Sequence, residues 1–132
     1  MTEEEKKYKI MLIDDDDFLV NMYATKFSGS DVAVEAYKSA GALIEKLQAG
    51  AKTDLILLDI VMPGMTGLEA LKQIRQDKLA EGTPVVMLTN QSDEKDITEA
   101  KQYGISGYIV KSAATPSEVV SEIIKIIEDS RK

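Results

Sequence analysis

Residues 54–67 read DLILLDIVMPGMTG and combine a strand signal, a carboxylate and a turn signal. The uninterrupted aliphatic run at residues 55–58 is typical of a strand buried on both faces of a parallel sheet. Asp59 follows directly, and a carboxylate in that position is partly desolvated, which costs free energy unless a partner offsets it. The Pro63-Gly64 pair then predicts a turn, and Thr66 is suited to cap a following helix. The stretch predicts a buried strand with a candidate functional residue at its end.

The same alternation of aliphatic runs and helix-period segments extends from residue 9 to the end of the chain. Five runs predict strands, and only the second alternates in the way that an exposed edge strand does. Strands that alternate with helices predict an α/β fold with a doubly wound, five-stranded parallel sheet. The predicted strands are residues 10–13, 32–37, 55–58, 85–88 and 108–110, and the predicted helices are 18–27, 40–49, 67–76, 93–103 and 116–129, with Asp17, Ser39, Thr66, Ser92 and Thr115 as their N-caps.

Length and composition restrict the possible function classes. A chain of 132 residues fits a single domain, predicted at residues 9–130 after a frayed, charged segment at 1–8. The absence of Cys and His excludes thiolate metal sites, thiol nucleophiles and a Ser-His triad. The net charge of −7 has the wrong sign for coating nucleic acid or an anionic membrane. With no apolar run of membrane-spanning length and no signal peptide, the sequence predicts a cytoplasmic protein that binds neither nucleic acid nor membrane.

In parallel sheets of this kind, function lies beyond the carboxyl ends of the strands. The first predicted strand ends in four consecutive aspartates, residues 14–17, and each close pair repels by roughly 1–4 kcal/mol unless a cation intervenes. Asp59, Thr89 and Lys111 end the third, fourth and fifth strands. Without Cys or His, oxygen ligands favour Mg²⁺, Mn²⁺ or Ca²⁺. Carboxylates, a hydroxyl and an ammonium on one rim suit phosphoryl transfer to an aspartate, although each residue alone is also compatible with an ordinary solvated strand end.

Four segments, in this order, resemble the receiver domain of bacterial two-component response regulators, especially the stand-alone chemotaxis-type receivers. The resemblance covers about residues 9–128 and implies a flavodoxin-like sheet with strand order 2-1-3-4-5. It also implies a phosphorelay signalling switch, rather than a conventional enzyme. The four segments are Leu12-Ile13-Asp14-Asp15-Asp16, LLDIVMPGMTG at residues 57–67, Met87-Leu88-Thr89 and Gly107-Tyr108-Ile109-Val110-Lys111.

The resemblance implies a phosphoacceptor and a metal site. Asp59 matches the residue that takes a phosphoryl group from the phosphohistidine of a histidine kinase or a histidine phosphotransfer protein. Asp15, Asp59 and the backbone carbonyl of Val61 match the ligands of Mg²⁺, with Mn²⁺ as an alternative ion. Asp14 matches the residue that assists the metal through water.

The resemblance also implies a switch. Lys111 and Thr89 match the residues that contact the phosphoryl oxygens, and Tyr108 matches an aromatic residue that moves inward and changes a surface for a downstream protein. By this likeness the domain would assist its own phosphorylation and the hydrolysis of its acyl phosphate. The chain departs from the family pattern where Ser112 replaces the usual Pro after the lysine and where Asn90 replaces a small residue after the threonine.

Three other readings fit parts of the pattern. A haloacid-dehalogenase-like phosphatase also uses an Asp-x-Asp pair after its first strand, here Asp14 and Asp16, but requires further acidic ligands after the lysine. A degenerate receiver that acts only as a binding scaffold usually lacks the acceptor aspartate or the lysine. A flavin or nucleotide carrier needs a phosphate-binding loop where this chain has four aspartates. The acidic residues after the lysine are Glu118, Glu122, Glu128 and Asp129, all on the last predicted helix.

Overall fold

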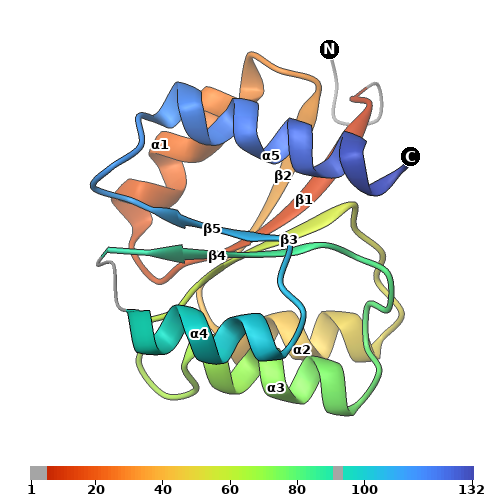
Figure 1. Ribbon diagram of the computed structural model, residues 1–132. Helices are drawn as coiled ribbons and strands as arrows, with labels where there is room; N and C mark the ends of the chain where they lie inside the picture. Colours follow the sequence, from red (N-terminus) through yellow and green to blue (C-terminus); the bar gives the residue numbers. More distant parts are fainter. Residues whose placement is uncertain (1–5, 91–93) are drawn as a thin grey trace.

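Five parallel strands form one sheet, and their order confirms the predicted topology. The computed structural model describes residues 6–90 and 94–132. Within these residues the sheet order is β2-β1-β3-β4-β5, and every pairing is parallel (Figure 1). The elements are β1 (Tyr8–Ile13), α1 (Asp17–Ser28), β2 (Val32–Tyr37), α2 (Ala40–Gln48), β3 (Leu55–Asp59), α3 (Gly67–Gln76), β4 (Val85–Thr89), α4 (Glu94–Gln102), β5 (Gly107–Val110) and α5 (Pro116–Ser130).

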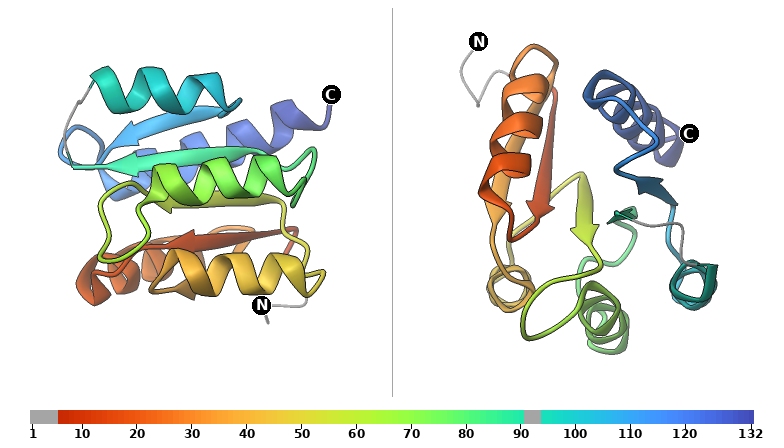
Figure 2. Two further views of the ribbon diagram at one scale, coloured as in Figure 1. Left: turned by 90° about the horizontal axis from the view of Figure 1, so that it is seen from below. Right: turned by 90° about the vertical axis from the view of Figure 1, so that its left-hand side faces the viewer.

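The central strands are buried on both faces because helices cover the sheet from both sides. Along β1, Met11 and Ile13 pack into the apolar layer beneath α2, α3 and α4, whereas Ile10 and Leu12 pack into the layer beneath α1 and α5. Figure 1 shows the two helical layers on opposite sides of the sheet, and Figure 2 shows α2, α3 and α4 side by side. This two-sided burial explains why the central strands consist of aliphatic runs without polar alternation.

Short polar side chains start most of the helices at the predicted positions. Thr66 and Thr115 each form a reciprocal capping box with the glutamate three residues later, and Ser39 accepts a hydrogen bond from a backbone N–H in the first turn of α2. These caps satisfy backbone N–H groups that have no partner inside the helix. The predicted cap Ser92 lies outside the described residues.

The predicted N-cap of the first helix is wrong by one residue. Asp16, not Asp17, is the N-cap: its Oδ1 accepts hydrogen bonds from the N–H groups of Phe18 at 2.9 Å and Leu19 at 3.3 Å. An N-cap side chain accepts from N–H groups two or three residues later, and its own backbone is extended. Asp16 meets both conditions. Asp17 is instead the first helical residue, and its carboxylate pairs with Lys38 at 2.9 Å.

The first strand begins earlier than predicted, at the end of the segment 1–8 that we expected to be frayed; residues 1–5 of that segment lie outside the described residues. Tyr8 is buried, its N–H donates to the carbonyl of Asp31 at 2.9 Å, and its hydroxyl donates to Glu128 on α5 at 3.1 Å. Periodicity does not reveal these contacts, because their partners are distant in sequence. In the described part of the chain, no helix combines the length and apolar character that a membrane crossing requires.

The two phenylalanines provide a test of the packing. Both lie on α1: Phe27 is fully buried in the apolar layer between the helix and the sheet, whereas Phe18 is 76% exposed. We expect Phe27→Ala to lower the free energy of unfolding by about 3–5 kcal/mol and Phe18→Ala to change it by less than about 0.5 kcal/mol. Urea unfolding followed by circular dichroism measures both variants, and equal losses would contradict this packing.

Candidate functional site

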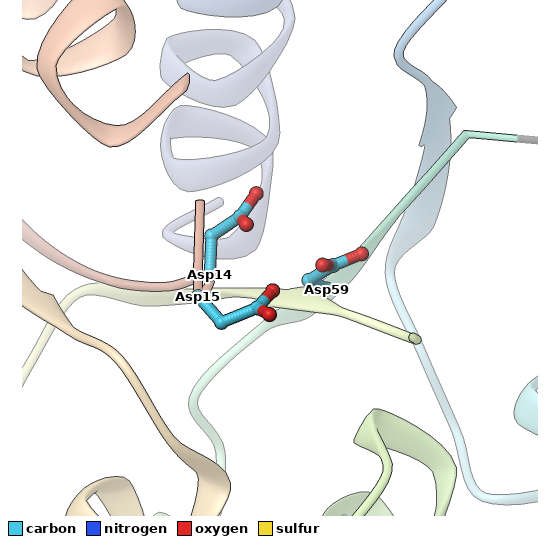
Figure 3. A group of neighbouring side chains, drawn as sticks. All are labelled: Asp14, Asp15 and Asp59. Carbon is cyan, nitrogen blue, oxygen red and sulfur yellow. The ribbon is translucent and has the colours of Figure 1, made fainter. Parts of the chain in front are cut away.

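The register of the parallel sheet brings the ends of β1 and β3 together. Ile13 pairs with Leu58. The next residues, Asp14 and Asp59, therefore lie side by side at the carboxyl ends of the two neighbouring strands. Figure 3 shows these two side chains gathered there with Asp15. The residues are 45 positions apart in sequence, and their proximity depends on the pairing of β1 with β3.

The three carboxylates are close enough to share one ion. Each of Asp14, Asp15 and Asp59 offers one oxygen atom, and these oxygens lie within 4.8 Å of one another. Asp14 and Asp59 are buried, whereas Asp15 is exposed. In residues 6–90 and 94–132, this is the only group of three or more such side chains with metal-binding spacing. An all-oxygen donor set of this kind fits a hard divalent cation.

Lys111 closes the site from the end of β5. Its Nζ lies 2.7 Å from Asp14 Oδ2 and 3.5 Å from Asp59 Oδ1, and only 6% of its side chain is exposed. Burial lowers the pKa of this ammonium, but the hydrogen bond from it to Asp14 and the charge of Asp59 outweigh burial and raise the pKa overall. Lys111 is therefore a fixed positive charge that faces two carboxylates.

The carboxylate of Asp14 is held in place at both oxygens. Oδ2 accepts the hydrogen bond from Lys111, and Oδ1 accepts one from the N–H of Asp16 at 3.0 Å. Because Asp16 in turn caps α1, the start of that helix and the position of Asp14 are linked. The sequence identified Asp14 as a site residue but assigned Asp16 no part in positioning it.

The fold changes the acidity of Asp59. Burial raises its pKa from 3.8 to about 6; the charge of Lys111 opposes this shift, and the charges of Asp14 and Asp15 add to it. Only 3% of the residue is exposed. The negative charge on Asp59 is thus disfavoured in the folded protein, and a cation or an attached electrophile at this carboxylate would relieve that strain.

Thr89 and Val61, the two other residues expected at the site, differ in their exposure to solvent. Thr89 is the last residue of β4 and is buried, and it follows Leu88, which pairs with Asp59 across the sheet. Val61 lies in the loop between β3 and α3, and 71% of it is exposed. Its aliphatic side chain has no polar group to offer, so any contribution to a metal site comes from its backbone carbonyl.

Tyr108 is not inside the acidic pocket. It lies on β5 opposite Met87 of β4, and 43% of it is exposed. The Nζ of Lys101, at the end of α4, lies 5.6 Å from the centroid of its ring, a distance that permits a cation–π contact. The structure therefore shows Tyr108 in an outward orientation beside α4.

The loop after Lys111 tolerates serine in place of the usual proline. The described residues contain no cis peptide bond, so the Lys111–Ser112 peptide is trans. The N–H of Lys111 donates to the carbonyl of Thr89 at 2.6 Å, and that of Ala113 donates to Val110 at 3.0 Å. These bonds hold the lysine at the end of β5 with Ser112 exposed to solvent.

Tyr23 is a buried residue near the site that the sequence does not single out. It lies on α1 and is 2% exposed. Burial raises the pKa of its hydroxyl, and the charges of Lys111 and Asp14 act on that hydroxyl in opposite directions. A tyrosine on the apolar face of a helix resembles any core residue, so its position gives no sequence signal for the site.

The acidic residues after Lys111 do not complete a phosphatase metal site. Glu118 closes the capping box at the start of α5, Glu128 accepts a hydrogen bond from Tyr8, and Asp129 pairs with Lys132 at 3.5 Å. Neither they nor Glu122 belong to the acidic group formed by Asp14, Asp15 and Asp59. This arrangement disfavours the haloacid-dehalogenase-like reading.

The acidity of Asp59 gives a pH-dependent prediction for the metal-free protein. A carboxyl whose pKa rises on folding stabilises the protein below its unfolded pKa and loses that contribution as pH rises through about 6. We therefore expect Asp59→Asn to be more stable than wild type at pH 7.5, by roughly 1–3 kcal/mol, and no more stable at pH 4. Thermal unfolding in EDTA measures this difference. Asp31→Asn, which removes an exposed charge, is the control. If Asp59→Asn were no more stable than wild type at pH 7.5, the charged form of Asp59 would not destabilise the fold, which would contradict the raised pKa.

Known proteins share both the sequence pattern and the fold. Residues 10–124 match the family described as response regulator receiver domain. Chemotaxis protein CheY1 of Helicobacter pylori is 30% identical over 121 residues, which cover 90% of this chain and 95% of that protein. Transcriptional regulatory protein ResD of Bacillus subtilis is 31% identical over 121 residues, which cover 92% of this chain but 48% of that protein. The structure of Vibrio cholerae chemotaxis protein CheY4 superposes with a TM-score of 0.81 at 27% identity, covering 90% of this chain and 98% of that chain.

The chain thus spans about half the length of some curated relatives and nearly the whole length of others. The family match covers every residue of the acidic site together with Thr89 and Lys111. The fold, the strand order and the family match agree. This chain belongs to the response regulator receiver domain family.

Proposed function

We propose that the protein is a phosphorylation-driven signalling switch in which Asp59 accepts a phosphoryl group. The observation that supports this proposal is the cluster of three carboxylates, with oxygens within 4.8 Å of one another, beside the buried ammonium of Lys111. Receiver domains belong to two-component systems, so the donor is the phosphohistidine of a histidine kinase or of a histidine phosphotransfer protein. We propose that the protein acts in the cytoplasm with such a partner.

Asp59 is the best candidate for the nucleophile among the three aspartates. Both oxygens of Asp14 are already engaged, by Lys111 and by the Asp16 N–H, and Asp15 lies on the exposed side of the cluster. In the proposed transfer, a carboxylate oxygen of Asp59 attacks phosphorus, the P–N bond of the donor breaks, and the imidazole nitrogen leaves with the bonding electron pair. The product is an acyl phosphate.

The residues present fit a divalent metal ion. Asp15, Asp59 and the carbonyl of Val61 would hold Mg²⁺, or Mn²⁺, and Asp14 would assist through water. When bound, the ion supplies positive charge that offsets the charge of the incoming phosphoryl oxygens. The buried ammonium of Lys111 supplies a second fixed positive charge, and we propose that it contacts a phosphoryl oxygen together with the hydroxyl of Thr89.

We propose that the signal leaves the site through Thr89 and Tyr108. Thr89 is buried at the end of β4, and Tyr108 lies one strand away with an exposed ring. A shift of Thr89 toward the phosphoryl group would open space for Tyr108 to turn inward, away from Lys101. The change would alter the surface formed by α4 and β5, which would then bind a downstream protein. A few new charge-assisted hydrogen bonds are sufficient to bias such a two-state surface.

The proposed metal site predicts a thermal response to Mg²⁺. The folded state alone gathers the carboxylates, so millimolar Mg²⁺ is expected to raise the melting temperature of the wild type by several degrees. Asp15→Asn is expected to abolish most of this rise. Asp17→Asn should retain it, because Asp17 pairs with Lys38 outside the cluster. An unchanged response in Asp15→Asn would remove Asp15 from the metal site.

Incubation with Mg²⁺ and acetyl phosphate tests the acceptor. We expect intact-mass spectrometry to show one acid-labile phosphoryl group on the wild type and on Asp77→Asn, which alters an exposed carboxylate, and none on Asp59→Asn. Equal incorporation in Asp59→Asn would contradict the assignment. Steady turnover of a phosphate ester that survives in Asp59→Asn but is lost in Asp14→Asn would instead favour a phosphatase.

A further inference from the structure

The first residue of α3 packs directly on the backbone of the acceptor aspartate. Gly67 is buried, and its N–H donates to the carbonyl of Ile60 at 2.8 Å. A Cβ atom placed on Gly67 would lie 2.1 Å from the carbonyl oxygen of Asp59 and 2.9 Å from its carbonyl carbon. Both separations are below van der Waals contact. Any side chain at this position would have to displace either α3 or the peptide group of Asp59.

Hydrogen bonds hold both α3 and Asp59 in place. The capping box of Thr66 and Glu69 fixes the start of α3, with hydrogen bonds of 3.0 and 3.2 Å. On the other side, Asp59 pairs with Leu88 of β4, and the next N–H, that of Ile60, donates to the carbonyl of Leu88 at 3.2 Å. The contact is therefore a junction between a helix start and a strand end that is held by hydrogen bonds on both sides.

The requirement for glycine at this junction is one of space and not of backbone conformation. Gly64, in the same loop, has a φ of +76° with nothing within 4 Å of its hypothetical Cβ, which is the usual reason for glycine in a turn. Gly67 does not adopt a positive φ, and backbone atoms crowd it instead. The two glycines of the loop thus have different physical roles.

The junction also closes the loop that carries Val61. The hydrogen bond from Gly67 to Ile60 joins the two ends of this segment, so the loop leaves and returns at the acceptor residue. We propose that Gly67 is a positioning residue that sets the carboxylate of Asp59 and the carbonyl of Val61 in register for the same metal ion. This inference rests on the proposed function, since it concerns the efficiency of that site.

Gly67→Ala tests the inference against Gly41→Ala as its matched control. Gly41 lies in α2, and a Cβ there meets nothing within 4 Å. At a temperature well below both melting points, we expect Gly67→Ala to bind Mg²⁺ at least tenfold more weakly by isothermal titration calorimetry. We expect its phosphorylation at saturating Mg²⁺ and acetyl phosphate to be at least tenfold slower. Gly41→Ala should match wild type in both. A purely structural role for Gly67 would lower the melting temperature and leave both values of the folded protein unchanged, which would overturn the inference.

A second pair of variants keeps the test decisive if Gly67→Ala does not fold. Thr66→Ala removes the cap of α3 without adding volume, and Ser39→Ala removes the cap of α2. In each cap the hydroxyl oxygen lies 3.2 Å from the backbone nitrogen that donates to it. We expect the two variants to lose similar stability. Only Thr66→Ala should weaken Mg²⁺ binding several-fold and, in NMR spectra of the metal-free protein, shift the amide resonances of residues 59–62. Wild-type affinity and shifts in Thr66→Ala would refute the inference.

Failure of this inference is distinguishable from failure of the proposed function. If wild-type protein takes up no phosphoryl group at Asp59, the proposed function is wrong and the positioning role is wrong with it. If wild type and Gly41→Ala react and Gly67→Ala reacts equally well, only the positioning role is wrong.

Discussion

The pairing of β1 with β3 is the constraint on which the site depends. It brings Asp14 and Asp15 beside Asp59, and the resulting repulsion is opposed mainly by Lys111, whose ammonium contacts two of the three carboxylates. The compensation is incomplete, because burial, the main cause, still raises the pKa of Asp59 to about 6 against the opposing charge of Lys111. The apolar layers on both faces of the sheet hold this charged arrangement together by fixing the strands that carry it.

Incomplete compensation would make the site responsive to an added cation or an attached phosphoryl group. A pocket whose charges were already balanced would gain little from a cation or from conversion of Asp59 to an acyl phosphate. Here either event would relieve a strain that the fold maintains. Both Asp14 and Asp59 are buried, but both oxygens of Asp14 accept hydrogen bonds, whereas burial raises the pKa of Asp59. Two neighbouring carboxylates in the fold therefore have different roles open to them.

The contacts around the site differ between the acidic residues and Tyr108. Asp16 ties the start of α1 to Asp14, and Gly67 ties the start of α3 to Asp59, so both helices are attached at the acidic edge of the sheet. Within the described part of the chain, Tyr108 has no comparable anchor to the acidic group: 43% of it is exposed, and its ring lies 5.6 Å from the ammonium of Lys101. A surface change at α4 and β5 would therefore leave the anchored side of the pocket undisturbed.

The fold class, the elements and the main site residues could all be predicted from local sequence signals. Aliphatic runs marked the buried strands, short polar residues marked helix starts, and Asp59 and Lys111 stood out at the ends of strands. The strand order came from family resemblance, because periodicity describes each segment separately and contains no information on which strands pair. Tertiary structure decided the rest: the cap at Asp16, the anchoring of Tyr8, the raised pKa of Asp59 and the contact of Gly67 with its backbone. Each of these depends on distances between particular atoms, most of them far apart along the chain, and such distances are fixed only when the sheet and its helices have packed.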